Sequence, residues 1–280
     1  MSGTVSYVDA VVLGVVEGLT EFLPVSSTGH LTVFEGLLDL PVDDKSVTAL
    51  TAIIQFGAIV ATFLYFRQDI LRLAAVWFRG LVSAEARQEP DYRFAWCVIA
   101  GSLPIAVVGL VAEPLITGPL RSLWVVAGAL IVWSGVLVWA ERNPAQKYGE
   151  EDLSLKQVLI IGLVQCVALV PGVSRSGATI SAGLLLGASR VAATRLSFFL
   201  AIPALTGAGV LSLKDVNTDV VGWGELAVGT LVSFVVAYAS IAWLLKLVAK
   251  YPITTFVPYR IGAGIAVIIL VASGVISATG

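Results

Sequence analysis

The sequence predicts an all-α polytopic membrane protein that forms a single membrane domain over residues 1–280 and contains two inverted-topology repeats. The first observation is composition: 58% of the residues are hydrophobic, 13% are charged and the mean hydropathy is +0.93. Soluble domains carry about 25% charged residues. The second is a set of long apolar stretches, and the third is a polar motif that occurs twice, 148 positions apart. These features indicate a chain that crosses a bilayer several times.

Six stretches are apolar over roughly the ~20 residues that a bilayer core requires. They lie at about 48–66, 95–113, 121–140, 192–212, 225–248 and 259–277. The two motif segments, 10–38 and 157–187, are also apolar, but each is interrupted at its centre by Pro and Gly. Each half is too short to span at ~1.5 Å per helical residue, so we expect re-entrant helix pairs.

The basic residues test this topology. With the N-terminus outside and both motif segments re-entrant, three basic residues fall outside, namely Lys45, Arg121 and Lys214, and Arg175 lies at depth. Thirteen fall inside, and they are Arg67, Arg72, Arg79, Arg87, Arg93, Arg142, Lys147, Lys156, Arg190, Arg195, Lys246, Lys250 and Arg260. This distribution follows the positive-inside rule. The segment 67–93 is then an inside loop, which we expect to form an amphipathic helix at the interface.

Each half of the chain therefore holds one re-entrant pair and three spans. The first repeat covers 1–141 and the second covers 152–280. Because three is odd, the second repeat enters the membrane inverted, so the two broken tips approach from opposite faces. Inverted repeats of this kind place their sites near the midplane.

The two motifs align without a gap. The first reads EGLTEFLPVSSTGH over 17–30, and the second contains PGVSRSGAT over 171–179. A shift of 148 lays Glu17 on Gln165, Ser26 on Ser174, and Ser27 on Arg175. Polar groups are costly in hydrocarbon, so polar residues at membrane depth mark a functional site.

Glu17 and Glu21 are four residues apart and share one helix face. Two neighbouring carboxylates repel, which favours either a shared proton or a bound cation. Their oxygens suit Mg²⁺ or Ca²⁺, so both are candidates for metal binding or proton transfer. The alternative is a solvated helix face.

Hydroxyl groups follow Pro24 in the first motif and Pro171 in the second. Such a turn leads into a helix N-terminus, where free N–H groups and the dipole attract an anion. Arg175 adds a forked donor that matches phosphate oxygens. The alternatives are simple capping for the hydroxyls and an interfacial position for the arginine. The hydroxyl residues are Ser26, Ser27, Thr28, Ser174 and Ser176.

His30, the one histidine of the chain, lies three residues beyond Ser27. Positions i and i+3 touch on a helix, so the imidazole is a candidate acid or base beside a hydroxyl. A structural role is the alternative. Gln55 interrupts an apolar stretch and is a further candidate ligand residue, with interhelical hydrogen bonding an equal alternative. Together these groups indicate a site for a phosphate group on a lipid.

Other classes of function are excluded or less well supported. The formal net charge is −2 and no basic stripe is present, so we expect no nucleic acid partner. The first ten residues lack a basic segment, so we expect no cleavable signal peptide. A polyprenyl-phosphate transporter or flippase remains open because broken helices in inverted repeats also serve alternating access.

The two motifs resemble those of the undecaprenyl-diphosphate phosphatase family, also called the bacitracin-resistance family, and the resemblance covers essentially the whole chain. It implies hydrolysis of undecaprenyl diphosphate to the monophosphate and phosphate with a divalent cation, Mg²⁺ or Ca²⁺. This reaction recycles the carrier lipid for cell-wall synthesis. The resemblance also implies a bacterial inner membrane location, a site facing outside and a possible homodimer.

Carried over by position, the resemblance implies catalytic roles for Glu17, Glu21, Ser27, His30 and Arg175. Ser27 is the candidate nucleophile, His30 its assistant and Arg175 the diphosphate clamp. Further donors to the substrate would be Ser26, Thr28, Ser174, Ser176 and Thr179.

Overall fold

The computed structural model describes residues 5–40, 45–116, 118–142, 145–213 and 220–278, and these form α-helices joined by short turns. The first half of the chain contains α1 (Tyr7–Thr20), α2 (Ser27–Leu37), α3 (Lys45–Tyr65), α4 (Arg67–Val82), α5 (Pro90–Ile116) and α6 (Leu123–Glu141). The second half contains α7 (Leu155–Gln165), α8 (Arg175–Leu185), α9 (Arg190–Ser212), α10 (Trp223–Val248) and α11 (Val257–Ala272). The predicted all-α class is confirmed.

Six helices within the described residues are long and apolar enough to cross a membrane, and each matches one predicted span. They are Ser46–Tyr65, Pro90–Ile116, Leu123–Glu141, Arg190–Ser212, Trp223–Val248 and Ile253–Ala272. The last begins and ends earlier than the predicted 259–277. A 3₁₀ turn at Ile253–Phe256 leads into α11, and Gly274, with φ of 74°, follows its C-terminus. The chain is thus a multi-pass membrane protein.

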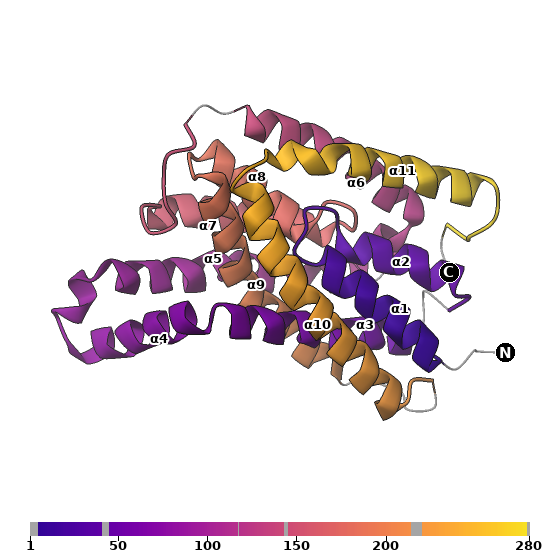
Figure 1. Cartoon of the computed structure of the whole chain (residues 1–280), viewed down its shortest axis with the longest axis horizontal. Coiled ribbons are helices and arrows are strands. Elements are labelled where there is room, and N and C mark those ends of the chain that lie inside the picture. Colours follow the sequence, from indigo (N-terminus) through magenta and orange to yellow (C-terminus); the bar gives the residue numbers. More distant parts are fainter. Residues whose placement is uncertain (1–4, 41–44, 117, 143–144, 214–219, 279–280) are drawn as a thin grey trace.

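The motif segments form two short antiparallel helix pairs. In the first segment α1 and α2 are separated by residues 21–26, and in the second α7 and α8 are separated by residues 166–174. Figure 1 shows α1–α2 on the side of the molecule where both termini lie, and α7–α8 on the other side of the centre. Each helix is 11 to 14 residues long, shorter than a span.

The spans pack around these pairs in a few large contacts. Helix α10 lies against both α1 and α3, α5 against α7, and α11 against α6. Glycines allow close approach: Gly14 and Gly18 of α1 face the backbone of α10, and Gly162 of α7 faces the backbone of α5. Small residues therefore let the short helices sit inside the bundle.

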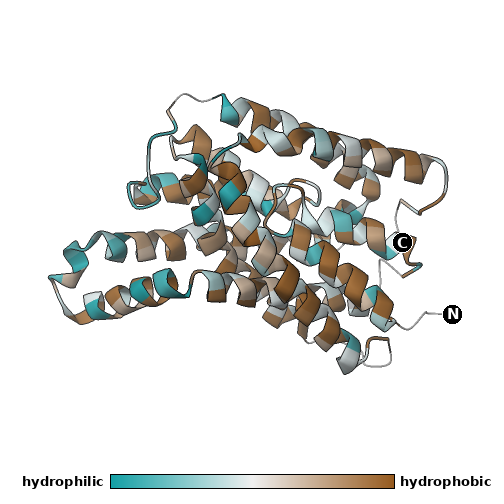
Figure 2. Cartoon of the chain, viewed as in Figure 1, coloured by the Kyte–Doolittle hydropathy of each residue, from teal (hydrophilic) through white to brown (hydrophobic). Residues whose placement is uncertain are grey.

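Segment 67–93 is helical as predicted, but α4 continues from α3 after Phe66 and pairs with the first part of α5. This hairpin projects from the bundle at the end opposite the termini (Figure 1). Figure 2 shows that hydrophilic residues gather on this hairpin and on the nearby loop before α7, whereas the bundle is mostly hydrophobic.

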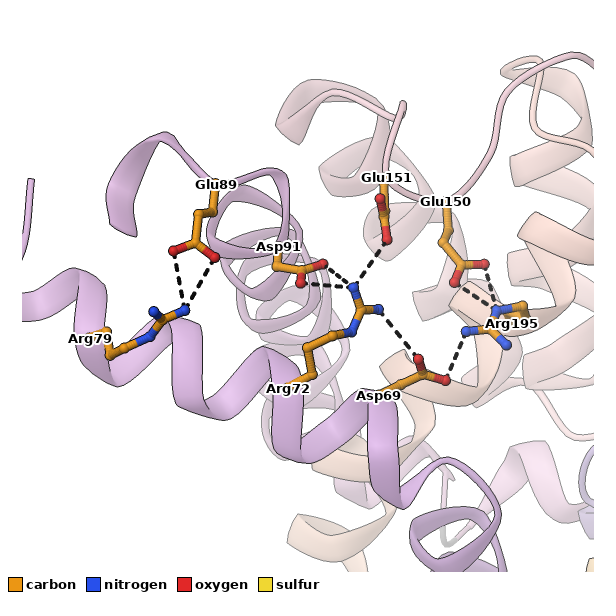
Figure 3. Close-up of polar contacts among 8 residues, drawn as sticks. All are labelled: Asp69, Arg72, Arg79, Glu89, Asp91, Glu150, Glu151 and Arg195. Atoms are coloured by element: carbon orange, nitrogen blue, oxygen red, sulfur yellow. Dashed lines mark hydrogen bonds and ion pairs between the residues drawn. The ribbon is translucent and has the colours of Figure 1, made fainter. Parts of the chain in front are cut away.

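Ion pairs join this hairpin to the bundle. Asp69 of α4 accepts from Arg72 at 3.3 Å and from Arg195 of α9 at 3.0 Å (Figure 3). Arg195 also binds Glu150 at 2.6 Å, and Arg72 binds Asp91 of α5 at 2.7 Å. An exposed ion pair stabilises the folded protein by at most ~1 kcal/mol. Because Asp69, Arg72 and Arg195 each take part in two or more pairs, the pairs form one network that connects the hairpin to α9. Lys214, predicted outside, lies outside the described residues.

A glycine-to-alanine pair tests the close helix contacts. A Cβ on Gly57 of α3 would lie 2.1 Å from the carbonyl oxygen of Thr230 on α10, whereas one on Gly128 of α6 meets nothing within 4 Å. We expect Gly57→Ala to destabilise the protein by about 1–3 kcal/mol through overpacking. Gly128→Ala should be neutral or slightly stabilising. Thermal unfolding in detergent measures both, and equal melting temperatures would contradict the close contact.

Candidate functional site

The two broken helix pairs begin their second helices in the same way. Ser26 caps α2 and accepts from the backbone N–H of Gly29 at 3.4 Å, and Ser174 caps α8 and accepts from Gly177 at 3.1 Å. Both serines have positive φ, 75° and 81°. A positive φ is uncommon outside glycine and is found where the surrounding structure enforces it.

The two tips meet and complete each other's hydrogen bonds. The Ser26 Oγ accepts from the backbone N–H of Gly172 at 3.0 Å. In return the Leu23 carbonyl accepts from Ser176 at 2.9 Å and from Ser174 at 3.4 Å. Polar backbone at membrane depth must be satisfied inside the protein, and here each tip satisfies the other.

Gly172 makes this contact possible. Its φ is +98°, and a Cβ at this position would lie 2.3 Å from the carbonyl oxygen of Val126 on α6. Only glycine fits both the backbone conformation and the space.

Glu21 is the centre of the polar cluster beside the tips. Its Oε2 accepts from the Ser27 hydroxyl at 2.5 Å and from the Gln55 amide at 3.3 Å. Its Oε1 accepts from Arg175 at 2.9 Å, and the same guanidinium donates to the carbonyl of Ser197 at 2.8 Å. The side chains of Glu21 and Arg175 are only 4% and 9% exposed. The structure thus brings together four of the candidate residues: Glu21 and Ser27 from the first motif segment, Arg175 from the second, and Gln55 from α3.

Glu17 is fully buried next to this cluster. Within the described residues neither of its carboxylate oxygens has a hydrogen-bond partner. Its repeat equivalent Gln165 is also fully buried, and both polar atoms of its amide are likewise without a partner. Buried groups of this kind point to a missing ligand, ion or water.

His30 lies on α2 but its hydrogen bonds lead away from Ser27. Its Nδ1 is 2.7 Å from the Ser26 carbonyl, which only accepts, so Nδ1 carries the proton. In the neutral ring Nε2 then accepts from the Tyr259 hydroxyl at 2.7 Å, and the two rings stack at 5.6 Å. The predicted approach of His30 to Ser27 is therefore replaced by a bond between Ser27 and Glu21.

The remaining candidates have varied positions. Thr28 is exposed, and Thr179 donates within its own helix to the carbonyl of Arg175 at 2.9 Å. The hydroxyls of Ser174 and Ser176 are 3.0 Å apart and serve the tip contact described above.

Sequence reasoning missed Arg260. The charge distribution assigns it to the inside, but its side chain is fully buried beneath the tips, where it donates to the carbonyls of Pro24 at 2.6 Å and Gly172 at 2.9 Å. The sequence did contain a clue to this position, because Arg260 is the second residue of the predicted span 259–277. An ionisable residue within a span marks a functional position.

The donor set is suited to a divalent cation only in part. No group of three or more His, Cys, Asp or Glu side chains in the described residues is placed to hold a metal. Glu17 offers two oxygens without a hydrogen-bond partner in the described residues, and Glu21 Oε1, which accepts one hydrogen bond, retains a lone pair. Mg²⁺ commonly binds one or two carboxylates and completes its shell with water and substrate phosphate, so the residues fit such an ion.

A groove lies beside His30. It has a volume of about 390 Å³ and its walls are mostly apolar, with His30 and Tyr259 as the polar exceptions. Its walls come from α2, α6 and α11 and include Val33, Leu130, Ala263 and Leu270.

Comparison with known proteins gives a consistent family. The family model of "Bacitracin resistance protein BacA" matches residues 10–266. "Undecaprenyl-diphosphatase 1" of Streptomyces coelicolor is 59% identical over 97% of this chain and 98% of its own length. "Undecaprenyl-diphosphatase" of Acidothermus cellulolyticus is 53% identical over 97% and 99%. The protein of that name from Corynebacterium diphtheriae is 42% identical over 99% and 98%.

The tip contact yields a stability prediction. Ser26→Gly keeps a residue that tolerates positive φ but removes the acceptor for Gly29 and Gly172. Because the buried N–H of Gly172 is then left unpaired, we expect a loss of about 1–3 kcal/mol. Asp39→Gly is the matched control because Asp39 also has a positive φ, of 55°. It should leave stability unchanged or raise it. Equal melting temperatures of the two variants would contradict a structural role for the Ser26 hydroxyl.

Proposed function

Because the chain belongs to the bacitracin resistance protein BacA family, we propose that it hydrolyses undecaprenyl diphosphate to undecaprenyl phosphate and inorganic phosphate. Relatives of 42% to 59% identity that align over nearly their whole length carry the name undecaprenyl-diphosphatase. The reaction would recycle the carrier lipid for cell-wall synthesis and so confer bacitracin resistance.

The observation that carries this proposal is the cluster around Glu21. It joins a carboxylate, the Ser27 hydroxyl and the Arg175 guanidinium, at the point where the N-termini of α2 and α8 come together. Guanidinium groups and helix N-termini both bind phosphate oxygens. An apolar groove beside His30 offers a place for the hydrocarbon chain of a lipid substrate. A lipid that carries a phosphate group needs both an anion-binding site for the phosphate and an apolar surface for the hydrocarbon chain.

We assign the nucleophile to Ser27. Its Oγ forms a bond to the terminal phosphorus while the bond from that phosphorus to the bridging oxygen breaks, and the lipid monophosphate leaves. The hydroxyl proton passes to Glu21, whose Oε2 lies 2.5 Å away. Water then cleaves the phosphoserine and inorganic phosphate departs. Arg175 stabilises the charge that spreads over the phosphoryl oxygens.

His30 supports a second route for the same reaction. In this route the imidazole activates water directly and Ser27 serves only as a donor. In the structure the Nε2 lone pair accepts from the Tyr259 hydroxyl, so this route requires water to replace Tyr259 as the partner of Nε2.

We further propose that Glu17 and Glu21 hold a divalent cation, Mg²⁺ or Ca²⁺. The unpartnered oxygens of Glu17 support this assignment. When bound, such an ion would neutralise charge on the diphosphate. Ser26, Thr28, Ser174, Ser176, Thr179 and Gln55 would contribute the further polar contacts around the substrate.

The architecture supports two inverted repeats, 1–141 and 152–280, in the bacterial inner membrane. Ser26 and Ser174, 148 positions apart, cap their helices with the same strained backbone. The termini lie at one end and the arginine-rich network at the other, which favours an inside location for the network (Figures 1 and 3). We propose that the site opens to the outside. The homodimer remains a prediction from the family resemblance.

A polyprenyl-phosphate flippase is the second candidate. The observation that favours it is the meeting of two broken helix pairs inside the bundle, a feature of transporters. Phosphate release distinguishes the two functions, because a flippase without hydrolase activity releases none.

We predict that detergent-purified protein releases phosphate from undecaprenyl diphosphate in the presence of Mg²⁺ or Ca²⁺ and not after chelation. Glu21→Gln and Arg175→Ala should each lower the rate by about 100-fold or more. Glu35→Gln is the control. Glu35 is also a buried carboxylate, but its ion-pair partner is Arg121, at 3.3 Å, and not a residue of the cluster, so this variant should keep the wild-type rate. Failure of folded wild-type protein to release phosphate would contradict the proposal, and lipid transport in vesicles would be measured next.

A second prediction separates the two nucleophiles. Acid quench during turnover of substrate labelled in the terminal phosphate should leave label on the wild-type protein and none on Ser27→Ala. Ser181→Ala should retain it, because the Ser181 hydroxyl donates within α8 to Ala178 at 3.0 Å. Unlabelled wild-type protein, together with nearly full activity in Ser27→Ala, would assign the attack to water.

A further inference from the structure

Arg260 has an environment unlike that of any other arginine described above. It lies in the first turn of α11, and its side chain is fully buried in the bundle. In the described part of the chain no acidic side chain lies within ion-pair distance of it. A buried cation without a carboxylate is costly, so its other contacts must satisfy it.

Those contacts are carbonyl oxygens from both tips. Nη1 donates to Pro24 at 2.6 Å, and Nη2 donates to Gly172 at 2.9 Å and to Val173 at 3.2 Å. Nε lies 3.3 Å from the Ser134 hydroxyl of α6. One planar group therefore spans the two broken helix pairs and fixes them to α6 and α11.

The tips that it joins carry different parts of the cluster. Ser27 follows the Pro24 tip by three residues, and Arg175 follows the Gly172 tip by three residues. The distance between the hydroxyl and the guanidinium thus depends on how the tips are held. The Glu21 charge is met by Arg175, whereas the Arg260 charge has no such partner and adds to the positive potential beneath the tips.

We propose that Arg260 is a positioning residue for the hydrolysis: its guanidinium holds both tips so that Ser27 and Arg175 address one phosphate, and its uncompensated charge draws the diphosphate into the site. This inference rests on the proposed function. Arg260 acts through the tip carbonyls and through the field of its charge, and it does not touch the substrate.

The fork and the charge make separate contributions, so two variants distinguish them. Arg260→Lys keeps the positive charge, but a single ammonium group cannot reach carbonyls on both tips in the same way. Arg260→Met keeps the length of the side chain and removes both contributions. Arg190→Lys is the control, since Arg190 pairs with Glu141 at 2.5 Å in a different part of the bundle.

The experiment measures kcat and KM for undecaprenyl diphosphate, with hydrogen exchange of the tip amides at 22–26 and 170–174 as a second readout. We expect Arg260→Lys to lower kcat by about 100-fold with KM within about threefold, as displaced reacting groups do. Arg260→Met should lower kcat as much and also raise KM by about tenfold. Tip exchange should rise in both, and Arg190→Lys should resemble the wild type.

Three outcomes would overturn the proposal. Faster tip exchange with unchanged kcat and KM would leave Arg260 a purely structural role. Full activity of Arg260→Lys would contradict the claim that a forked guanidinium must bridge both tips. Loss of folded protein in both variants would show that folding, rather than positioning, requires the residue. Absence of phosphate release from the wild type would instead refute the proposed function, and the exchange readout would still report on the tips.

Discussion

Hydrogen bonds between the two broken helix pairs hold the centre of this molecule together. Backbone polar groups cannot be left unpaired in apolar surroundings, so a helix that breaks inside a bundle needs partners from elsewhere in the protein. Here Ser26 accepts from Gly172, Leu23 accepts from Ser176, and Arg260 donates to carbonyls of both tips. Neither pair is satisfied without the other, and the site is therefore composite.

This joint construction explains why the polar cluster sits where it does. Each tip ends in a strained serine and begins a helix whose N-terminus points toward the shared centre. The strain at Ser26 and Ser174 is tolerated because several hydrogen bonds hold each backbone in place. Ser27 and Arg175, the next residues along the chain, are thereby fixed relative to one another.

Glu21 occupies the donors that a phosphate would use. It accepts from Ser27, from Gln55 and from Arg175, three groups that suit an anionic ligand. Under the proposed function, a phosphoryl group that enters the cluster would compete with the Glu21 carboxylate for these same donors. The carboxylate oxygens of the nearby Glu17 have no hydrogen-bond partner in the described residues, which supports the proposed cation.

The local pattern of residues was enough to predict the helical class, the six spans and the two short broken pairs, and to choose Glu21, Ser27 and Arg175 as candidates. These follow from local composition: apolar length sets a span, and the clusters of Pro, Gly and hydroxyl residues at 24–29 and 171–177 mark the two breaks, although Pro104, Pro114 and Pro203 lie inside continuous spans. The hydrogen-bond partners of these side chains, in contrast, became known only from the three-dimensional arrangement of the helices. In the folded protein Ser27 is hydrogen-bonded to Glu21 and His30 to Tyr259, and the side chain of Arg260 is buried against the tips. The His30–Tyr259 and Arg260–Pro24 contacts join residues more than 200 positions apart, and they depend on how helices rotate and cross, which spacing along the chain does not encode.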